Sequence, residues 1–200
     1  MGHDPDVYAG TESDACGVEP RRLVVSMPTN LEIKIRVQSL TPFRRRLVAL
    51  PHCRRIPVLR QRDHYFHARQ GYLKLRIVSD GASELIFYER PRRRGASRSR
   101  YSRWPVADPR ALLRLLTNAL GIDAVVRKTR EVFLFENARI HLDRVAGLGT
   151  FIEIEVIVQH GIAQAHTLMD ELLRTLHLSP GASVGGSYAD LLMDRPDTRR

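Results

Sequence analysis

The stretch Leu31-Glu32-Ile33-Lys34-Ile35-Arg36-Val37 alternates apolar and charged side chains without interruption. Successive side chains of a β-strand point to opposite sides, so Glu32, Lys34 and Arg36 share one face of a strand and the apolar residues share the other. An acid and two bases on one face suit a surface that holds a metal cation together with a polyanion. Carboxylates are ligands for the cation, and Lys or Arg side chains bind phosphates.

The same alternation recurs in four later segments, 73–77, 127–131, 139–143 and 151–158. A single strand of this kind would also fit an antiparallel sheet with one face on the core and one in water. The repetition weighs against that alternative, because these polar faces are almost wholly ionised and rich in Arg, which suits bidentate recognition of phosphate. Together with the first strand, they present four carboxylates and seven cations: Glu32, Asp143, Glu153, Glu155, Lys34, Arg36, Lys74, Arg76, Lys128, Arg130 and Arg139.

Length and composition indicate one soluble domain. The chain has 200 residues, 43% of them hydrophobic, and no apolar run near the ~20 residues that span a bilayer. The first residues are acidic and lack the apolar centre of a secretory signal. The two cysteines, Cys16 and Cys53, are far apart and do not have the spacing of a zinc site. We therefore expect a cytoplasmic protein without a membrane partner.

The net charge of +10 raises the question of nucleic acid. Most of the excess lies between Arg90 and Arg103, a segment with seven Arg, no acid, one Gly and three Ser. We predict a loop here. It is either a solvated loop or a flap that faces a polyanion. Nucleic acid could bind through this segment, but it is a less favoured partner than a small molecule.

The pattern predicts three regions: a disordered extension over 1–26, a domain over 27–193 and a tail over 194–200. Met27, just before the first strand, is a candidate translation start. Expected strands are 30–37, 63–66, 72–78, 84–90, 125–136, 139–145 and 151–158. Expected helices are 41–50, 109–121, 162–178 and 188–193. This is an α+β architecture. The charged faces can act together only if the antiparallel strands close into a barrel or tunnel, with the helices packed outside.

Eight short motifs along the chain, taken in order, resemble those of a known family. They are 30–34 (Asn-Leu-Glu-Ile-Lys), 63–66, 71–76, 85–91, 126–130, 139–143, 147–149 followed by Glu153-Ile154-Glu155, and 187–192. In this order they are similar to the CYTH superfamily, which joins class IV adenylyl cyclases with thiamine triphosphatases and is also called the triphosphate tunnel metalloenzymes. The family motif Glu-x-Glu-x-Lys falls on Asn30, Glu32 and Lys34. Asn30 replaces the first Glu and makes the implied metal site less acidic.

The resemblance implies a site for Mg²⁺ or Mn²⁺ and a triphosphate. Glu153 and Glu155 would hold the metal, with Glu32 and Asp143 beside them. The implied triphosphate ligands are Lys34, Lys74, Arg76, Lys128, Arg130 and Arg139, with Arg36 and Arg90 as further candidates. Catalytic roles are expected for Lys34, Glu153 and His141. His141 would be either a general base near neutral pH or a hydrogen-bonding residue behind the metal ligands.

Three functions follow from this interpretation. The first is a metal-dependent triphosphatase that hydrolyses an inorganic or organic triphosphate. The alternative is a class IV adenylyl cyclase, which converts ATP to cyclic AMP and pyrophosphate. The third is a non-catalytic binder of polyphosphate or RNA that uses residues 90–103. The expected partner is a small molecule bearing a triphosphate, and a homodimer is left open.

Overall fold

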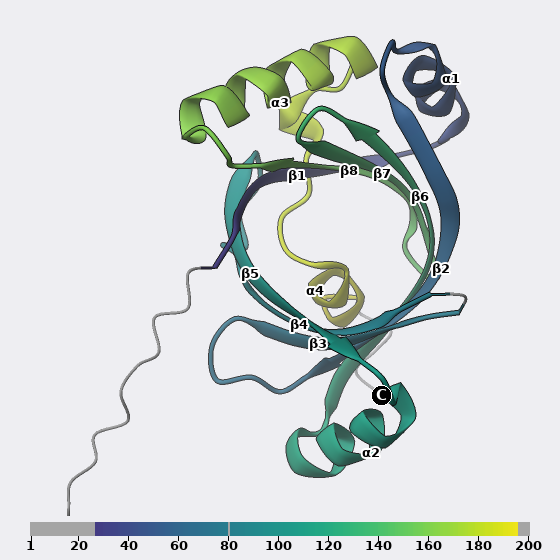
Figure 1. Cartoon of the computed structure of the whole chain (residues 1–200), viewed down its shortest axis with the longest axis vertical. Helices are drawn as coiled ribbons and strands as arrows, with labels where there is room; N and C mark the ends of the chain where they lie inside the picture. The colour runs from purple at the N-terminus through teal and green to yellow at the C-terminus, as the bar shows by residue number, and fades with distance from the viewer. Residues whose placement is uncertain (1–26, 80, 196–200) are drawn as a thin grey trace, which may run out of the picture.

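The computed structural model describes residues 27–79 and 81–195, and Figure 1 views them along the axis of a ring of strands. The predicted extension 1–26 and the last part of the predicted tail, 196–200, lie outside the described residues. Asp194 and Arg195 are described. Asp194 ends the last helix, and Arg195 donates a hydrogen bond to the carbonyl of Gly147.

The ring is a closed barrel in which every neighbouring pair of strands is antiparallel. Its strands are β1 (Thr29–Val37), β2 (Arg54–Phe66), β3 (Tyr72–Val78), β4 (Ser83–Glu89), β5 (Ser97–Val106), β6 (Ile122–Phe135), β7 (Ala138–Val145) and β8 (Gly149–Ile157). Their order around the barrel is β1-β5-β4-β3-β2-β6-β7-β8, and β8 pairs with β1 to close it. Each of these strands has a partner on both sides, so the barrel has no free edge. The predicted α+β fold with a closed antiparallel barrel is confirmed.

Both faces of β1 are buried, which decides between the two interpretations of its alternating sequence. Ile33 and Ile35 lie in a hydrophobic core outside the barrel. Glu32 and Lys34 face the lumen and are only 6% and 2% exposed. A polar strand face in open water would be far more exposed. The charged faces therefore belong to an enclosed interior.

Three helices cover the outer surface: α1 (Thr41–Ala49), α2 (Pro109–Leu120) and α3 (Ile162–Leu176). In Figure 1, α1 and α3 lie outside one side of the ring and α2 lies outside the opposite side. The buried residues of α3, which include Leu168 and Leu172, share one core with the outward apolar residues of β1, β7 and β8. No helix of the described residues is long and apolar enough to cross a membrane.

The fourth helix, α4 (Tyr188–Met193), lies within the ring instead of outside it (Figure 1). It begins with a capping box between Ser187 and Asp190. The hydroxyl of Tyr188 donates a 2.8 Å hydrogen bond to Asp143, and Lys34 Nζ lies 4.4 Å from the centre of the Tyr188 ring. Helix α4 therefore closes one end of the lumen. The expectation of outer helices holds for α1, α2 and α3.

Two strands differ from the sequence predictions. β5 occupies the second half of the segment predicted as an Arg-rich loop, and Ser97 to Arg103 pair with β1 and β4. Its buried Ser97 and Ser99 alternate with the exposed Arg98 and Arg100, so the strand lacks the apolar face that marks the others. β2 begins at residue 54, nine residues before the predicted start. The sequence did not indicate this first half as a strand, because it is largely exposed and contains a proline.

Packing of α3 on the barrel gives a stability prediction. The substitution Leu172→Ala removes a side chain that is 1% exposed, and we expect it to lower the free energy of unfolding by about 2–5 kcal/mol. Its neighbour Glu171 is exposed, so Glu171→Ala should change stability by only about 0.5 kcal/mol or less. Urea denaturation of both variants checks this. Equal midpoints would contradict the docking of α3.

Candidate active site

The lumen contains a cavity of about 380 Å³ lined by all eight strands and by the start of α4. This volume lies within the roughly 300–1,000 Å³ typical of small-molecule sites. Eleven of the predicted site residues line it: Glu32, Lys34, Lys74, Arg76, Arg90, Lys128, Arg130, Arg139, His141, Glu153 and Glu155. Their positions are as expected from the sequence, and their individual roles stay predictions.

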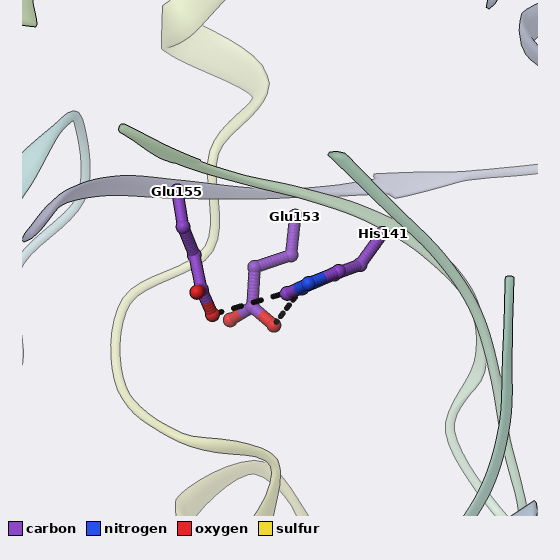
Figure 2. A group of neighbouring side chains, drawn as sticks. All are labelled: His141, Glu153 and Glu155. Atoms are coloured by element: carbon purple, nitrogen blue, oxygen red, sulfur yellow. Dashed lines mark ion pairs between the residues drawn. The ribbon is translucent and has the colours of Figure 1, made fainter. Parts of the chain in front are cut away.

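One side of the cavity carries the candidate metal ligands. His141 on β7 pairs directly with Glu153 on β8, and Glu155 lies two residues further along the same face. His141 Nδ1 is 3.5 Å from an oxygen of Glu153 and 3.6 Å from an oxygen of Glu155 (Figure 2). One donor atom from each residue lies within 4.8 Å of the other two. We call His141, Glu153 and Glu155 the ligand cluster.

The ionisation states of this side follow from burial and from neighbouring charges. Burial raises the pKa of Glu32 to about 7, and Glu153 and Glu155 add to this by repulsion, against the attraction of Arg90. Burial also opposes the charge on Glu153, but Lys34, His141 and Arg130 outweigh it and hold the pKa of Glu153 below its ordinary value. Burial lowers the pKa of His141, and Arg130 adds to this. The imidazole is therefore neutral at pH 7 and keeps a lone pair.

Another part of the cavity is organised around Asp63, which is fully buried on β2. Its carboxylate accepts hydrogen bonds from Arg76 at 2.8 and 2.9 Å and from Lys128 at 2.9 Å, and Lys74 Nζ lies 3.2 Å away. Three cations thus share one carboxylate. We call Asp63, Lys74, Arg76 and Lys128 the cation cluster.

The excess positive charge of the cation cluster shows in Lys128. Burial lowers the pKa of Lys128 to about 7, and repulsion from Arg76, Arg130 and Lys74 adds to this against the attraction of Asp63. An anion bound here would supply the missing negative charge and favour the protonated lysine. The sequence analysis assigned no role to Asp63. The sequence feature that could have identified Asp63 is a single acid on the inward face of a strand, two residues from Gln61 and two from Tyr65.

Lys34 and Arg130 both pair with the ligand cluster, and Arg130 also repels Lys128 of the cation cluster. Lys34 Nζ is 2.5 Å from Glu153, and Arg130 donates to Glu153 at 2.7 Å. Arg130 also makes a bidentate pair with Asp143 at 2.7 and 2.5 Å. Both cations are thus held in place by carboxylates while they face the cavity.

Two predicted site residues have other partners. Asp143 is fully buried and does not line the cavity; its oxygens are taken by Arg130 and by the hydroxyl of Tyr188. Asp143 therefore holds Arg130 in position, and its expected place beside a metal stays a prediction. Arg36 also lies outside the cavity lining. Its guanidinium donates to the carbonyl of Leu148 and lies 4.6 Å from the centre of the Phe151 ring.

The end of the cavity away from α4 combines an apolar wall with polar groups opposite it. β2 and β6 supply the apolar wall from Ile56, Leu59, Val132 and Leu134. Val132 pairs with His141, so this wall adjoins the ligand cluster. β1 and β5 lie four strands away around the barrel and supply Asn30, Ser99 and Tyr101. Asn30 is 3% exposed, and its Oδ1 has no hydrogen-bond partner. We call this part of the cavity the mouth.

The pocket residues fit a divalent cation on chemical grounds. Carboxylate oxygens suit Mg²⁺ and Mn²⁺, and a neutral imidazole suits transition ions. The buried Nδ1 of His141 has no hydrogen-bond partner, so it is available as a donor. Glu32 pairs with Arg90 at 3.0 Å, and Arg139 pairs with Glu155 at 3.0 Å.

Comparisons with known proteins agree with this architecture. A protein of Methanocaldococcus jannaschii, provisionally named an adenylate cyclase, is 27% identical over 140 residues, which is 66% of this chain and 80% of that protein. A structure from Pyrococcus horikoshii OT3 superposes with a TM-score of 0.73 at 24% identity, over 81% of this chain and 98% of that one. A Vibrio parahaemolyticus structure, also provisionally named an adenylate cyclase, has a TM-score of 0.66 at 19% identity, over 82% and 97%.

The structural likenesses show the shared fold. The family itself is shown by the domain model, which matches residues 29–188 and so spans β1 through the first residue of α4. On this evidence the chain belongs to the CYTH domain family, whose members act on triphosphate substrates.

Proposed function

We propose that this protein is a metal-dependent enzyme that hydrolyses an organic triphosphate inside the barrel. The observation that carries the proposal is the division of the cavity into two sides. The ligand cluster lies on β7 and β8, and the cation cluster is centred on β2 and β3. The two clusters occupy different arcs of the barrel: β3 and β8 are four strands apart, while β6, which carries Lys128, pairs with β7.

A triphosphate with a divalent cation matches this division in charge. The cation cluster has three positive groups for one carboxylate, and its excess is relieved by phosphate oxygens. On the other side Glu153 and Glu155 repel Glu32, although Arg90, Lys34 and Arg139 pair with the three glutamates. A divalent cation would reduce the remaining repulsion. A phosphate chain that bridges the two sides would satisfy both.

The chain's own residues would act on the substrate as follows. A divalent cation held by the ligand cluster would supply Lewis-acid polarisation of phosphate oxygens. Lys74, Arg76 and Lys128 would bind the triphosphate and fix its orientation. Lys34 and Arg130 lie beside Glu153, where they would stabilise charge that develops on the oxygens of the transferred phosphoryl group. Their buried ion pairs hold them ready without reorganisation during the reaction.

A second candidate is a class IV adenylyl cyclase, which the mouth of the cavity favours. Its apolar wall can accept a flat base, and Asn30 offers an unpaired buried acceptor opposite. In this reaction the ribose 3′-hydroxyl attacks the α-phosphorus and pyrophosphate leaves. Two provisional adenylate cyclases among the similar proteins point the same way. Both candidates use the same phosphate-binding groups and differ in which phosphorus is attacked.

A panel of substrates with Mn²⁺ or Mg²⁺ tests the proposal. We expect ATP or another organic triphosphate to release inorganic phosphate. Cyclic AMP with pyrophosphate would select the second candidate instead. We expect Glu155→Gln to lower kcat by roughly a hundredfold or more, the scale seen when one electrostatic element of a transition state is removed. Circular dichroism should show an intact fold.

Glu89→Gln is the matched control, because Glu89 pairs with Arg100 and does not line the cavity. Its activity should equal that of the wild type. A Glu155→Gln variant with full turnover would contradict the catalytic proposal. Binding without turnover, weakened steeply by salt, would instead support a polyphosphate or RNA binder.

Lys128 gives a pH prediction. Its pKa of about 7 means that it loses its proton as the pH rises through 7, and bound phosphate favours the protonated form. The affinity for tripolyphosphate should therefore fall above about pH 7, and binding at pH 8 should take up a proton. Calorimetry in buffers of different ionisation enthalpy measures this uptake. In Lys128→Arg the group stays charged and the uptake should fall. Equal uptake in both proteins would contradict this assignment.

Asp63 gives a prediction that separates stability from binding. Asp63→Asn leaves three buried cations without their carboxylate, and we expect a loss of about 3–5 kcal/mol in the free energy of unfolding. Tripolyphosphate replaces the lost negative charge, so it should raise the melting temperature of Asp63→Asn more than that of the wild type. Asp123→Asn, at a surface pair with His67, is the control. A smaller ligand shift in Asp63→Asn than in the wild type would refute this role.

A further inference from the structure

The Nδ1 atom of His141 is an unpaired nitrogen in the interior of the barrel. The residue is 4% exposed, and Nδ1 has no hydrogen-bond partner. It points at Glu153 and Glu155 from 3.5 and 3.6 Å, which is beyond the length of a normal hydrogen bond (Figure 2). A buried polar atom without a partner is costly, so this position calls for a group that accepts its lone pair.

The spacing of the ligand cluster suits one ion. An octahedral ion with bonds of about 2.1 Å holds neighbouring ligands about 3.0 Å apart and opposite ligands about 4.2 Å apart. The donor atoms here lie within 4.8 Å of one another, so small side-chain rotations would close them onto an ion. The Glu153 oxygen nearest His141 also accepts from Arg130. A carboxylate oxygen has a second lone pair, so it can also bind an ion.

Neither of the other two carboxylates expected at the metal belongs to the ligand cluster. Glu32 pairs with Arg90, and Asp143 is held by Arg130 and Tyr188. Two carboxylates and one imidazole remain facing the same point. This set has less negative charge and one nitrogen donor, in place of the four carboxylates that the resemblance implies.

We propose that His141 is a direct metal ligand through Nδ1, together with Glu153 and Glu155, and that the site therefore prefers Mn²⁺ to Mg²⁺. Mg²⁺ favours oxygen ligands and keeps its water, whereas first-row transition ions bind imidazole well. The inference rests on the proposed metal-dependent function. It replaces the two expected roles of His141, general base and hydrogen-bonding residue behind the metal, with that of a ligand.

Pulsed electron paramagnetic resonance of the full chain with Mn²⁺ and tripolyphosphate tests this inference directly. We expect a nitrogen coupling from an imidazole bound to Mn²⁺. The coupling should change when histidine is labelled with ¹⁵N in the otherwise unaltered protein, a measurement that needs no variant to fold. Among the described residues, His141 is the only histidine that lines the cavity. His166→Gln, on the exposed side of α3, should keep the signal.

Metal selectivity is the second measurement. His141→Asp restores an all-carboxylate cluster, so the nitrogen coupling should disappear. The ratio of Mn²⁺ to Mg²⁺ affinity should fall by at least roughly tenfold, the lower limit for loss of even an outer partner of a metal ligand. Calorimetric titration of each ion into wild type, His141→Asp and His166→Gln measures the ratio.

The outcomes separate this inference from the proposed function. Bound Mn²⁺ without nitrogen coupling in the wild type would overturn the role of His141 and leave a metal-dependent enzyme standing. An unchanged affinity ratio in a folded His141→Asp would overturn the claimed selectivity. Absence of any divalent cation binding with tripolyphosphate present would overturn both this inference and the proposed metal-dependent function.

Discussion

Closure of the antiparallel sheet deprives the inward side chains of bulk water, and the rest of the site depends on this constraint. An ionised group in such an interior must be balanced by another charge, because interactions between charges are several times stronger there than in water. Lys34 with Glu153 and Arg130 with Asp143 show this balance as close ion pairs. Where pairing is incomplete, the protein has a preference for a ligand. The incomplete places are the cation cluster, with three cations for one carboxylate, and Nδ1 of His141 in the ligand cluster, which has no hydrogen-bond partner.

The order of strands in the barrel keeps these two places apart. Cations that share Asp63 come from β3 and β6, on either side of β2, while His141 and the two glutamates come from the adjacent β7 and β8. If opposite charges were evenly mixed around the lumen, they would neutralise one another and leave no demand for a ligand. Grouping three cations around Asp63 leaves that part of the lumen short of negative charge, whereas each glutamate of the ligand cluster already has a cationic partner. Arg130 pairs with Glu153 and repels Lys128, so it couples the two clusters.

Local alternation in the sequence is sufficient to predict β1, β3, β7 and β8, because each has an apolar face outward and a charged face inward. The same logic fails for β5, which begins with buried Ser97 and Ser99 alternating with exposed Arg98 and Arg100 and so lacks an apolar face there. It also cannot reveal which charges meet. Asp63 accepts a hydrogen bond from Lys128, 65 positions away in the sequence, and Asp143 accepts one from Tyr188, 45 positions away. Such pairs depend on barrel order and on the entry of α4 into the lumen, neither of which is encoded in a local period.

The phosphate-binding groups alone do not determine which reaction occurs, since both candidate reactions need a bound, oriented triphosphate. The distinction must arise where the substrate's organic part lies. At the mouth, Ile56 and Val132 form part of a wall beside His141, and Asn30 faces them from β1. A base held there would fix where the ribose sits relative to the ligand cluster, and so which phosphorus an attacking oxygen can reach in line. Asn30 stands where the family motif has a carboxylate. An amide at this place adds hydrogen-bonding capacity without adding charge, which suits recognition of an organic group better than additional metal binding.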